Sequence, residues 1–420
     1  MAARRDHKRV LIYSHDSFGL GHLRRCRAIA HSLVGADSSV SVLILSGSPI
    51  IGSFDFRSRV DFVRVTGVIK LRNGEYVSLN LHVDIEETLA MRSSIIHHTA
   101  DIFDPDLFIV DKEPLGLRGE VRQTLDLLRA RGTPLILGLR DVMDDPSALE
   151  SEWERKNAIP ALSAYYDELW VYGLPQICDP LAGLDLPPSV RRRMIYTGYL
   201  RRNAAAPLPT PETLELLSGD FLLVTPGGGG DGEDLVNWVL AAYEHDQKYP
   251  GGAPPSGRAE TLVPALVVFG PFMNADLQAS FAARAARLTK VRAITFDARL
   301  EALMARAAGV VAMGGYNTFC EILSFDKRAL IVPRTTPRLE QFIRISRAAE
   351  LGLVAMLSDE DAGDPSVMAA ALHQLTQQRR PSEVVVPGLL DGMTNVNRLT
   401  ARWLASGRSE RFTLSARRNG

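Results

Sequence analysis

Residues 312–323 read AMGGYNTFCEIL, and they join the end of a buried strand to the start of a helix. The apolar run GVVAM leads into two glycines, Gly314 and Gly315, and the helical segment follows directly. A strand that passes through a glycine turn into a helix is the repeating unit of parallel α/β sheets. Ligands of such sheets bind outside the carboxyl ends of the strands, so this turn is a candidate binding site.

Polar side chains at the start of this helix suit a nucleotide. Asn317 and Thr318 add an amide and a hydroxyl to the backbone N–H groups of a helix start, which bind anions. Glu321 follows one turn later, on the same side as Thr318. A carboxylate in that place can accept both hydroxyls of a ribose while the helix start binds phosphates. Thr318 and Glu321 also fit a capping box, and the two interpretations are compatible.

The same alternation of short apolar runs and helical periodicity extends along the whole chain and predicts an α/β fold. In the first half the predicted strands are RVLIY, SVSVLIL, VDFVRV, DLFIV, PLILGL and DELWVYG. In the second half they are FLLVTP, ALVVFGP, VRAITF, GVVAM and ALIVP. The first helix has a predicted buried stripe of Leu23, Cys26, Ala30 and Leu33.

A chain of 420 residues exceeds the size at which one hydrophobic core stops growing, so two domains are expected. The segment TGYLRRNAAAPLPTPET, residues 197–213, interrupts the pattern with prolines and an alanine run and is the predicted linker. The predicted domains are residues 1–203 and 204–420, with the last helix free to pack back on the first domain.

Composition excludes several classes of protein. The 48 basic and 49 acidic side chains nearly balance, so nothing points to a nucleic-acid partner. The 3 cysteines are far apart and offer neither a disulfide framework nor a CxxC metal site, which favours a reducing cytoplasm. No stretch approaches the ~18 to 20 apolar residues of a membrane span. We therefore expect a cytoplasmic protein, with peripheral attachment to a membrane left open.

A second glycine turn follows the first predicted strand, where residues 15–27 read HDSFGLGHLRRCR. Gly21 and His22 stand at the start of a helix, which suits an anion. The spacing fits neither a dinucleotide fingerprint, which needs glycine where Arg24 stands, nor a GK[ST] phosphate loop. His22 is either a structural histidine that caps the helix or a group that acts on a substrate. The arginines behind it are expected on the surface, although Arg24 could face a ligand.

Two further loops of the second half have ligand-binding composition. TPGGGGDGED, residues 225–234, leaves the first strand of that half, and its glycines let a backbone approach a diphosphate closely. After ALIVP, a proline-punctuated loop leads to Glu340 and Gln341 at a helix start. An adjacent acid and amide suit sugar hydroxyls, although a solvated helix start has the same composition.

Charged side chains also end two predicted strands of the first half. Asp111 follows LFIV, and Arg140 and Asp141 follow LILGL. They either contact an acceptor substrate or form caps and salt bridges within the sheet. The D-x-D sequence at 104–106 precedes LFIV, which places it at the wrong end of the sheet for a metal–diphosphate site, and we expect no metal.

In this order and spacing the loops resemble those of the GT-B glycosyltransferases, in particular the clan that contains the N-acetylglucosaminyltransferase that makes lipid II. The resemblance covers nearly the whole chain, and its most specific part is G-G-x-N-T-x-x-E, then P-R, then E-Q. It implies two Rossmann-like doubly wound domains that face a cleft. It also implies a UDP-sugar donor as substrate, an acceptor hydroxyl, and no cofactor.

The resemblance also assigns roles to residues. The donor diphosphate would contact Gly21, Gly228, Gly229, Gly230, Gly315, Asn317 and Thr318. Glu321 would bind the ribose, and Phe296 would cover the nucleobase. Glu340 and Gln341 would hold the donor sugar.

The N-terminal loop GLGHLRRCRAIA is similar to that of the lipid II enzyme, and closer to that of the nucleotide-sugar hydrolase of pseudaminic acid biosynthesis. In both relatives the histidine lies across the cleft from the donor, which implies that His22 is the catalytic base of an inverting, metal-independent transferase. A hydrolase that uses water, or a UDP-sugar 2-epimerase, is the alternative; a mere sugar-nucleotide sensor would not need His22. Stretches such as LGLRDVMDDP have no counterpart, so the acceptor is not implied.

Overall fold

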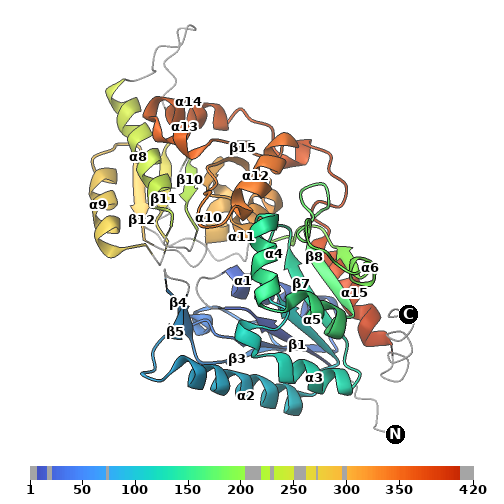
Figure 1. The fold of residues 1–420 in the computed structure, drawn as a ribbon. Helices are drawn as coiled ribbons and strands as arrows, with labels where there is room; N and C mark the ends of the chain where they lie inside the picture. Colours follow the sequence, from blue (N-terminus) through green and yellow to red (C-terminus); the bar gives the residue numbers. More distant parts are fainter. Residues whose placement is uncertain are drawn as a thin grey trace. The chain divides into compact units, whose positions relative to one another are not determined.

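The structure is a computed structural model that describes residues 7–16, 21–71, 75–203, 219–227, 231–249, 262–270, 273–295 and 300–406. The chain forms two compact units, one of residues 1–200 with 388–420 and one of residues 201–387. Each unit has its own parallel sheet with helices packed against it (Figure 1). The predicted α/β class with two doubly wound domains is therefore confirmed. Residues 204–213 of the predicted linker lie outside the described residues.

The sheet of the first unit has seven parallel strands in the order β3-β2-β1-β6-β7-β8-β9. Its strands are β1 (Lys8–Ser14), β2 (Val40–Ser46), β3 (Val60–Arg64), β6 (Leu107–Asp111), β7 (Leu135–Arg140), β8 (Glu168–Tyr172) and β9 (Met194–Tyr196). Its helices are α1 (Gly21–Ala36), α2 (Ile85–Phe103), α3 (Arg122–Ala130), α4 (Pro146–Arg155), α5 (Ala158–Tyr165), α6 (Pro188–Arg191) and α15 (Gly392–Ala405). The hairpin β4 (Val68–Lys70) and β5 (Tyr76–Ser78) stands apart from the sheet.

Apolar side chains explain why this sheet is buried on both faces. Every residue of β6 and β8 is buried, which is the pattern of a parallel strand covered by helices on each side. The predicted stripe on α1 is confirmed, because Leu23, Cys26, Ala30 and Leu33 are all buried.

The last helix belongs to the first unit, and Figure 1 shows α15, in red, among the blue and green elements. Asn395 Nδ2 donates to the carbonyl oxygen of Thr197 at 2.9 Å. Trp403 Nε1 and Arg402 Nη2 both donate to the carboxylate of Glu168, which is buried in β8. A buried carboxylate needs such partners, so α15 completes the core of this unit.

The second unit has six parallel strands in the order β12-β11-β10-β13-β14-β15. Its strands are β10 (Leu222–Thr225), β11 (Ala265–Val268), β12 (Val291–Ile294), β13 (Gly309–Ala312), β14 (Arg328–Ile331) and β15 (Ala355–Met356). Its helices are α8 (Glu233–Lys248), α9 (Ala275–Ala285), α10 (Leu300–Arg306), α11 (Tyr316–Ser324), α12 (Glu340–Glu350), α13 (Asp359–Gly363) and α14 (Pro365–Leu375).

Both sheets reverse their strand order once, between β1 and β6 in the first unit and between β10 and β13 in the second. The loops that leave the strands at such a switch point diverge and leave a crevice where ligands of doubly wound sheets bind. Within the described residues, no helix is both long and apolar enough to cross a bilayer.

Candidate functional site

The switch point of the first unit brings His22 and Asp111 together. His22 is the second residue of α1, which follows β1, and Asp111 is the last residue of β6, the strand beside β1. The Nδ1 atom of His22 lies 2.5 Å from Oδ2 of Asp111. His22 keeps 19% of its side chain exposed whereas Asp111 is almost fully buried. A partly exposed imidazole bonded to a buried carboxylate is the arrangement that orients a catalytic histidine.

Arg25 holds the carboxylate of Asp111 in place. Its Nε donates to Oδ1 and its Nη2 to Oδ2, each at 2.8 Å, in a bidentate pair that is buried on both sides. Arg25 lies one turn after His22, among the buried residues of α1. The expectation that the arginines behind His22 are surface residues is therefore wrong for Arg25.

The charges of this group determine its protonation. Burial alone would raise the pKa of Asp111, but Arg25 and His22 outweigh it and hold that pKa well below its ordinary value. Asp111 is therefore an anion at neutral pH, and its Oδ2 accepts a hydrogen bond from the Nδ1–H group of His22. Nη2 of Arg25 also lies 3.1 Å from that Nδ1, and since a guanidinium only donates, this contact is a repulsion and not a hydrogen bond.

His22 is consequently uncharged at neutral pH, with the lone pair on Nε2. Burial lowers its pKa, and Arg25 and Lys112 lower it further, while Asp111 acts in the opposite direction. His15, which follows β1, lies edge-on to His22 with ring centroids 5.6 Å apart, and its own burial keeps its pKa low. His15 thus adds no positive charge beside His22 at neutral pH.

The other predicted residues of this unit have different environments. Gly21 is the first residue of α1, and residues 17–20 of its loop lie outside the described residues. Asp141 is buried, and it accepts hydrogen bonds from Tyr199 Oη at 2.7 Å and from the Val142 amide at 2.8 Å. Arg140 is half-buried at the end of β7. These hydrogen bonds of Asp141 hold the loop after β7 in place, which agrees with the structural alternative given for this residue.

At the switch point of the second unit, the turn after β13 is shaped for close approach by a ligand. Gly314 has φ +82°, and a Cβ there would lie 2.5 Å from Cγ1 of Ile345, so the position needs glycine. Gly315 is the N-cap of α11, and a Cβ there would meet none of the described residues within 4 Å. The helix start therefore presents its amides beside open space.

The side chains predicted to bind the nucleotide lie on α11. Thr318 and Glu321 are buried, Glu321 with only 1% exposure. Asn317 Oδ1 accepts a hydrogen bond from Arg202 Nη2 at 2.6 Å. Because Gly315 is the N-cap and Thr318 lies inside the first turn of α11, the expected capping box with Thr318 as the cap of Glu321 is not formed.

The loops that follow the neighbouring strands also leave from the carboxyl ends of those strands. Thr225 at the end of β10 pairs with Ala312 of β13, which pairs with Ile331 of β14. The glycine loop, the GGYNT turn and the PRTTPR loop therefore leave adjacent strands. Gly228, Gly229, Gly230 and Phe296 lie outside the described residues. Glu340 and Gln341 open α12, as predicted, and both are buried.

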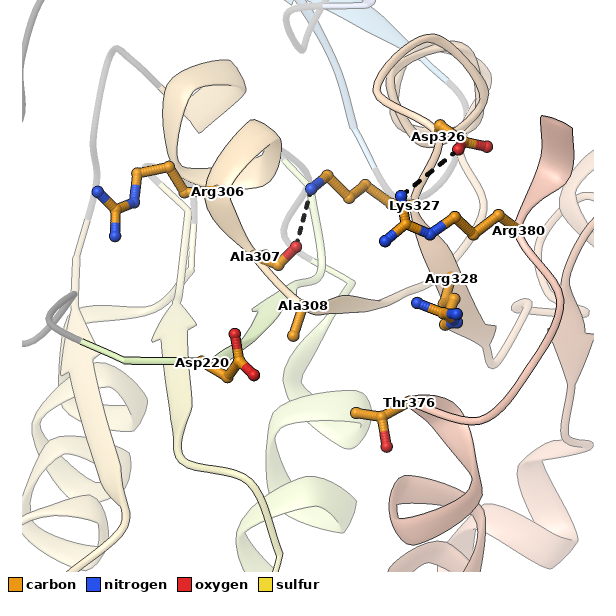
Figure 2. A pocket seen from close by; sticks show the side chains of 9 residues that line it. All are labelled: Asp220, Arg306, Ala307, Ala308, Asp326, Lys327, Arg328, Thr376 and Arg380. Atoms are coloured by element: carbon orange, nitrogen blue, oxygen red, sulfur yellow. Dashed lines mark hydrogen bonds and ion pairs between the residues drawn. The ribbon is translucent and has the colours of Figure 1, made fainter.

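A cavity of about 320 Å³ lies at the amino ends of the strands of this sheet (Figure 2). Lys327 Nζ donates to the carbonyl oxygen of Ala307 at 2.9 Å, and Arg328 Nε donates to that of Gln378 at 2.5 Å. Both carbonyls follow the last turn of a helix, so these cations stabilise helix C-termini. The cavity lies at the amino ends of the strands, away from the glycine turns, and is not the predicted donor site.

The structural neighbours share this fold. No family profile matches the sequence, and no curated protein does. The glycosyltransferase VinC in complex with dTDP is 17% identical at a TM-score of 0.56, covering 97% of this chain and 100% of that one. UDP-GlcNAc 2-epimerase from Neisseria meningitidis, bound to UDP-GlcNAc, is 12% identical at a TM-score of 0.59, and the match covers 95% of this chain and 99% of the epimerase. MurG from Acinetobacter baumannii is 12% identical at a TM-score of 0.52, and the match covers 97% of this chain and 98% of MurG. The chain thus has the fold of GT-B glycosyltransferases.

Proposed function

We propose that the protein is an inverting, metal-independent glycosyltransferase that moves a sugar from a UDP-sugar to an acceptor hydroxyl. The observation that carries this proposal is the His22–Asp111 pair, with its 2.5 Å contact, at the switch point of the first sheet. A histidine that only capped α1 would not need a buried anion on its ring nitrogen.

The reaction follows from the protonation state of that pair. Nε2 of His22 takes the proton of the acceptor hydroxyl, and Asp111 stabilises the imidazolium that forms. The acceptor oxygen then forms a bond to the anomeric carbon of the donor. The bond from that carbon to the diphosphate oxygen breaks, and UDP leaves with the electron pair. A single displacement of this kind inverts the anomeric configuration.

The second unit supplies the donor-binding part of the proposal. The amides at the start of α11 would stabilise the charge that develops on the departing diphosphate, with Asn317 and Thr318 beside them. The buried carboxylate of Glu321 would accept the ribose hydroxyls. Glu340 and Gln341 would bind the hydroxyls of the sugar. Fixed amides and the helix dipole take the place that a metal ion has in other nucleotide-sugar enzymes.

Two alternatives use the same residues. The His22–Asp111 pair would activate water as readily as an alcohol, which would make the protein a nucleotide-sugar hydrolase. A UDP-sugar 2-epimerase is the other alternative, supported by the structural neighbour of that kind.

A panel of UDP-sugars, assayed for UDP release with and without cell-extract acceptors, tests the proposal. UDP release that depends on an acceptor, together with a product of inverted configuration by NMR, is the expected result. Release at the same rate without any acceptor would instead identify a hydrolase. Conversion of the sugar at C2 without a lasting glycoside would identify an epimerase. Absence of both release and conversion with every sugar would refute all three.

A further inference from the structure

One arginine contacts both residues assigned to the donor sugar. Arg334 lies in the loop after β14, and its Nη2 donates to Oε1 of Glu340 at 2.6 Å. Its Nη1 forms an ion pair with Asp231, at the end of the glycine loop after β10. Its Nε lies 3.3 Å from the amide oxygen of Gln341, when that amide is oriented so that its NH₂ donates to the carbonyl of Met313. Arg334 thus joins two loops and the first turn of α12.

In the opposite orientation the oxygen of Gln341 accepts a hydrogen bond from the backbone amide of Arg334 at 3.3 Å, but it then also faces the carbonyl oxygen of Met313, acceptor against acceptor. The orientation with two good hydrogen bonds links α12 to the residue just before Gly314. Arg344, one turn further along α12, donates to the carbonyl oxygen of Gly314 at 3.0 Å and is fully buried. The start of α12 is therefore bonded to the turn after β13 through Gln341 and Arg344, and to the loop after β14 through Arg334.

A surface salt bridge would be a simpler interpretation, but the burial argues against it. Arg334 keeps 24% of its side chain exposed, whereas the carboxylate side chain of Glu340 is only 5% exposed. A buried carboxylate has two oxygens and several acceptor sites, so one bond to a guanidinium fixes its rotamer and leaves capacity for a hydroxyl. The planar fork of an arginine suits three partners that lie apart, because its N–H donors are spread over a rigid plane whereas those of an ammonium share one nitrogen.

We propose that Arg334 is the positioning residue of the donor-sugar subsite. It holds the carboxylate of Glu340 and the amide of Gln341 in the geometry that receives the sugar hydroxyls, and it ties both to the end of the glycine loop through Asp231. This inference rests on the proposed function, since it concerns the sugar part of the donor. The sugar should therefore add less affinity beyond that of UDP when Arg334 is replaced.

The test compares the dissociation constants of UDP and of the UDP-sugar that the wild-type enzyme turns over, both by calorimetry. Their ratio isolates what the sugar contributes. In Arg334→Lys and Arg334→Gln we expect that ratio to fall by about tenfold, the effect of one lost charged hydrogen bond, while the affinity for UDP stays unchanged. Arg347→Gln is the matched control, because Arg347 lies on α12 but is 49% exposed and forms an ion pair with Glu350 of the same helix.

A double-mutant cycle sharpens the test. If Arg334 acts through Glu340, adding Glu340→Ala to Arg334→Gln should weaken UDP-sugar binding no further than Glu340→Ala alone. Equal losses of UDP and UDP-sugar affinity would mean that Arg334 contacts the diphosphate directly and would overturn the positioning role. An unchanged ratio in a folded variant, judged by its melting curve, would also overturn it. A wild-type protein that binds no UDP-sugar would instead refute the proposed function.

Discussion

His22 differs from His31, the other histidine of α1, in what its ring contacts. His22 meets Asp111 across the switch point, whereas Nε2 of His31 accepts a hydrogen bond from the backbone amide of Arg57 at 3.3 Å. If His22 is the base, His22→Ala should lower kcat by ~10² to 10⁴, the usual contribution of a positioned base. UDP affinity should change little, because the residues assigned to UDP, apart from Gly21, belong to the other unit. His31→Ala is the control, and a His22→Ala enzyme that turns over as fast as this control would end the assignment.

The pH dependence of turnover follows from the lowered pKa of His22. Burial, and then Arg25, depress that pKa below its ordinary value of 6.5, so activity is present at neutral pH and is lost only as the pH falls through the depressed value. In Arg25→Met the nearby cation is gone, the pKa of His22 rises, and the acid limb of the kcat profile should move to higher pH. Asp111 would lose its buried partner, so we also expect a loss of about 3 to 5 kcal/mol in the free energy of unfolding. A limb that stays in place would show that Arg25 does not tune the base.

Glu321 allows a separate test of the nucleotide assignment. Its carboxylate is buried on α11 one turn after Thr318. Glu321→Ala should weaken UDP binding by about 1.5 to 3 kcal/mol, the usual contribution of a hydrogen bond to a charged group, measured by calorimetry. The same affinity in a folded variant would remove Glu321 from the ribose site.

At the scale of elements, the long apolar runs predicted the central strands of both sheets, because a strand buried on both faces needs an unbroken run of apolar residues. The short strands β9 and β15 at the sheet edges were not predicted, and neither was the hairpin β4–β5. Elements of two or three residues have too few positions to show a period. The buried position of Arg25 was missed for a different reason: it depends on Asp111, 86 residues away, which no local pattern reports.

The two glycines of the GGYNT turn make different demands on the structure. Gly314 has a left-handed backbone, and a Cβ there would clash with Ile345. Gly315 has φ −56°, and a Cβ there would meet none of the described residues. Gly314→Ala should therefore cost about 1 to 3 kcal/mol of stability in thermal or denaturant unfolding, because a side chain is strained there. Gly315→Ala, the matched control, should leave the stability unchanged and weaken UDP binding, since its new methyl group would lie where a phosphate approaches. Equal stability of both variants would contradict this division of roles.

At the scale of the whole molecule, the sequence led to the fold and to half of the site. The glycine turns and the E-Q pair could be found because each follows an apolar run, which places it at the carboxyl end of a strand. The side chains that bond to these residues, and so set their charge and orientation, could not be found from the sequence. From the sequence, Asp111 is a charge at a strand end that either contacts an acceptor or forms a salt bridge, and Arg334 is part of a P-R motif. Both find their partners on other elements through the strand order of their sheets.

The proposed metal independence is best examined over the molecule as a whole. Asp104 and Asp106 of the D-x-D sequence lie at the amino end of β6, and both accept hydrogen bonds from Arg9, so they are occupied far from the switch point of their sheet. A second such sequence, residues 359–361, opens α13 after the edge strand β15, and Ser358 caps it. Across the described ranges no group of three or more His, Cys, Asp or Glu side chains could hold an ion.

The expected consequence is that the rate of UDP release is the same in excess EDTA as in magnesium or manganese. Helix-start amides and glycine-loop amides are fixed before the reaction, so they can stabilise the departing diphosphate without a cation. The measurement is the initial rate with the best UDP-sugar after dialysis against chelator, with a metal-dependent transferase as control for the chelator itself. A rate that collapses in EDTA and recovers with added metal would mean that the donor diphosphate brings an ion to the site. The amides of α11 would then be insufficient alone, and the carboxylates of Asp231 and Glu340 would be the first to examine as its ligands.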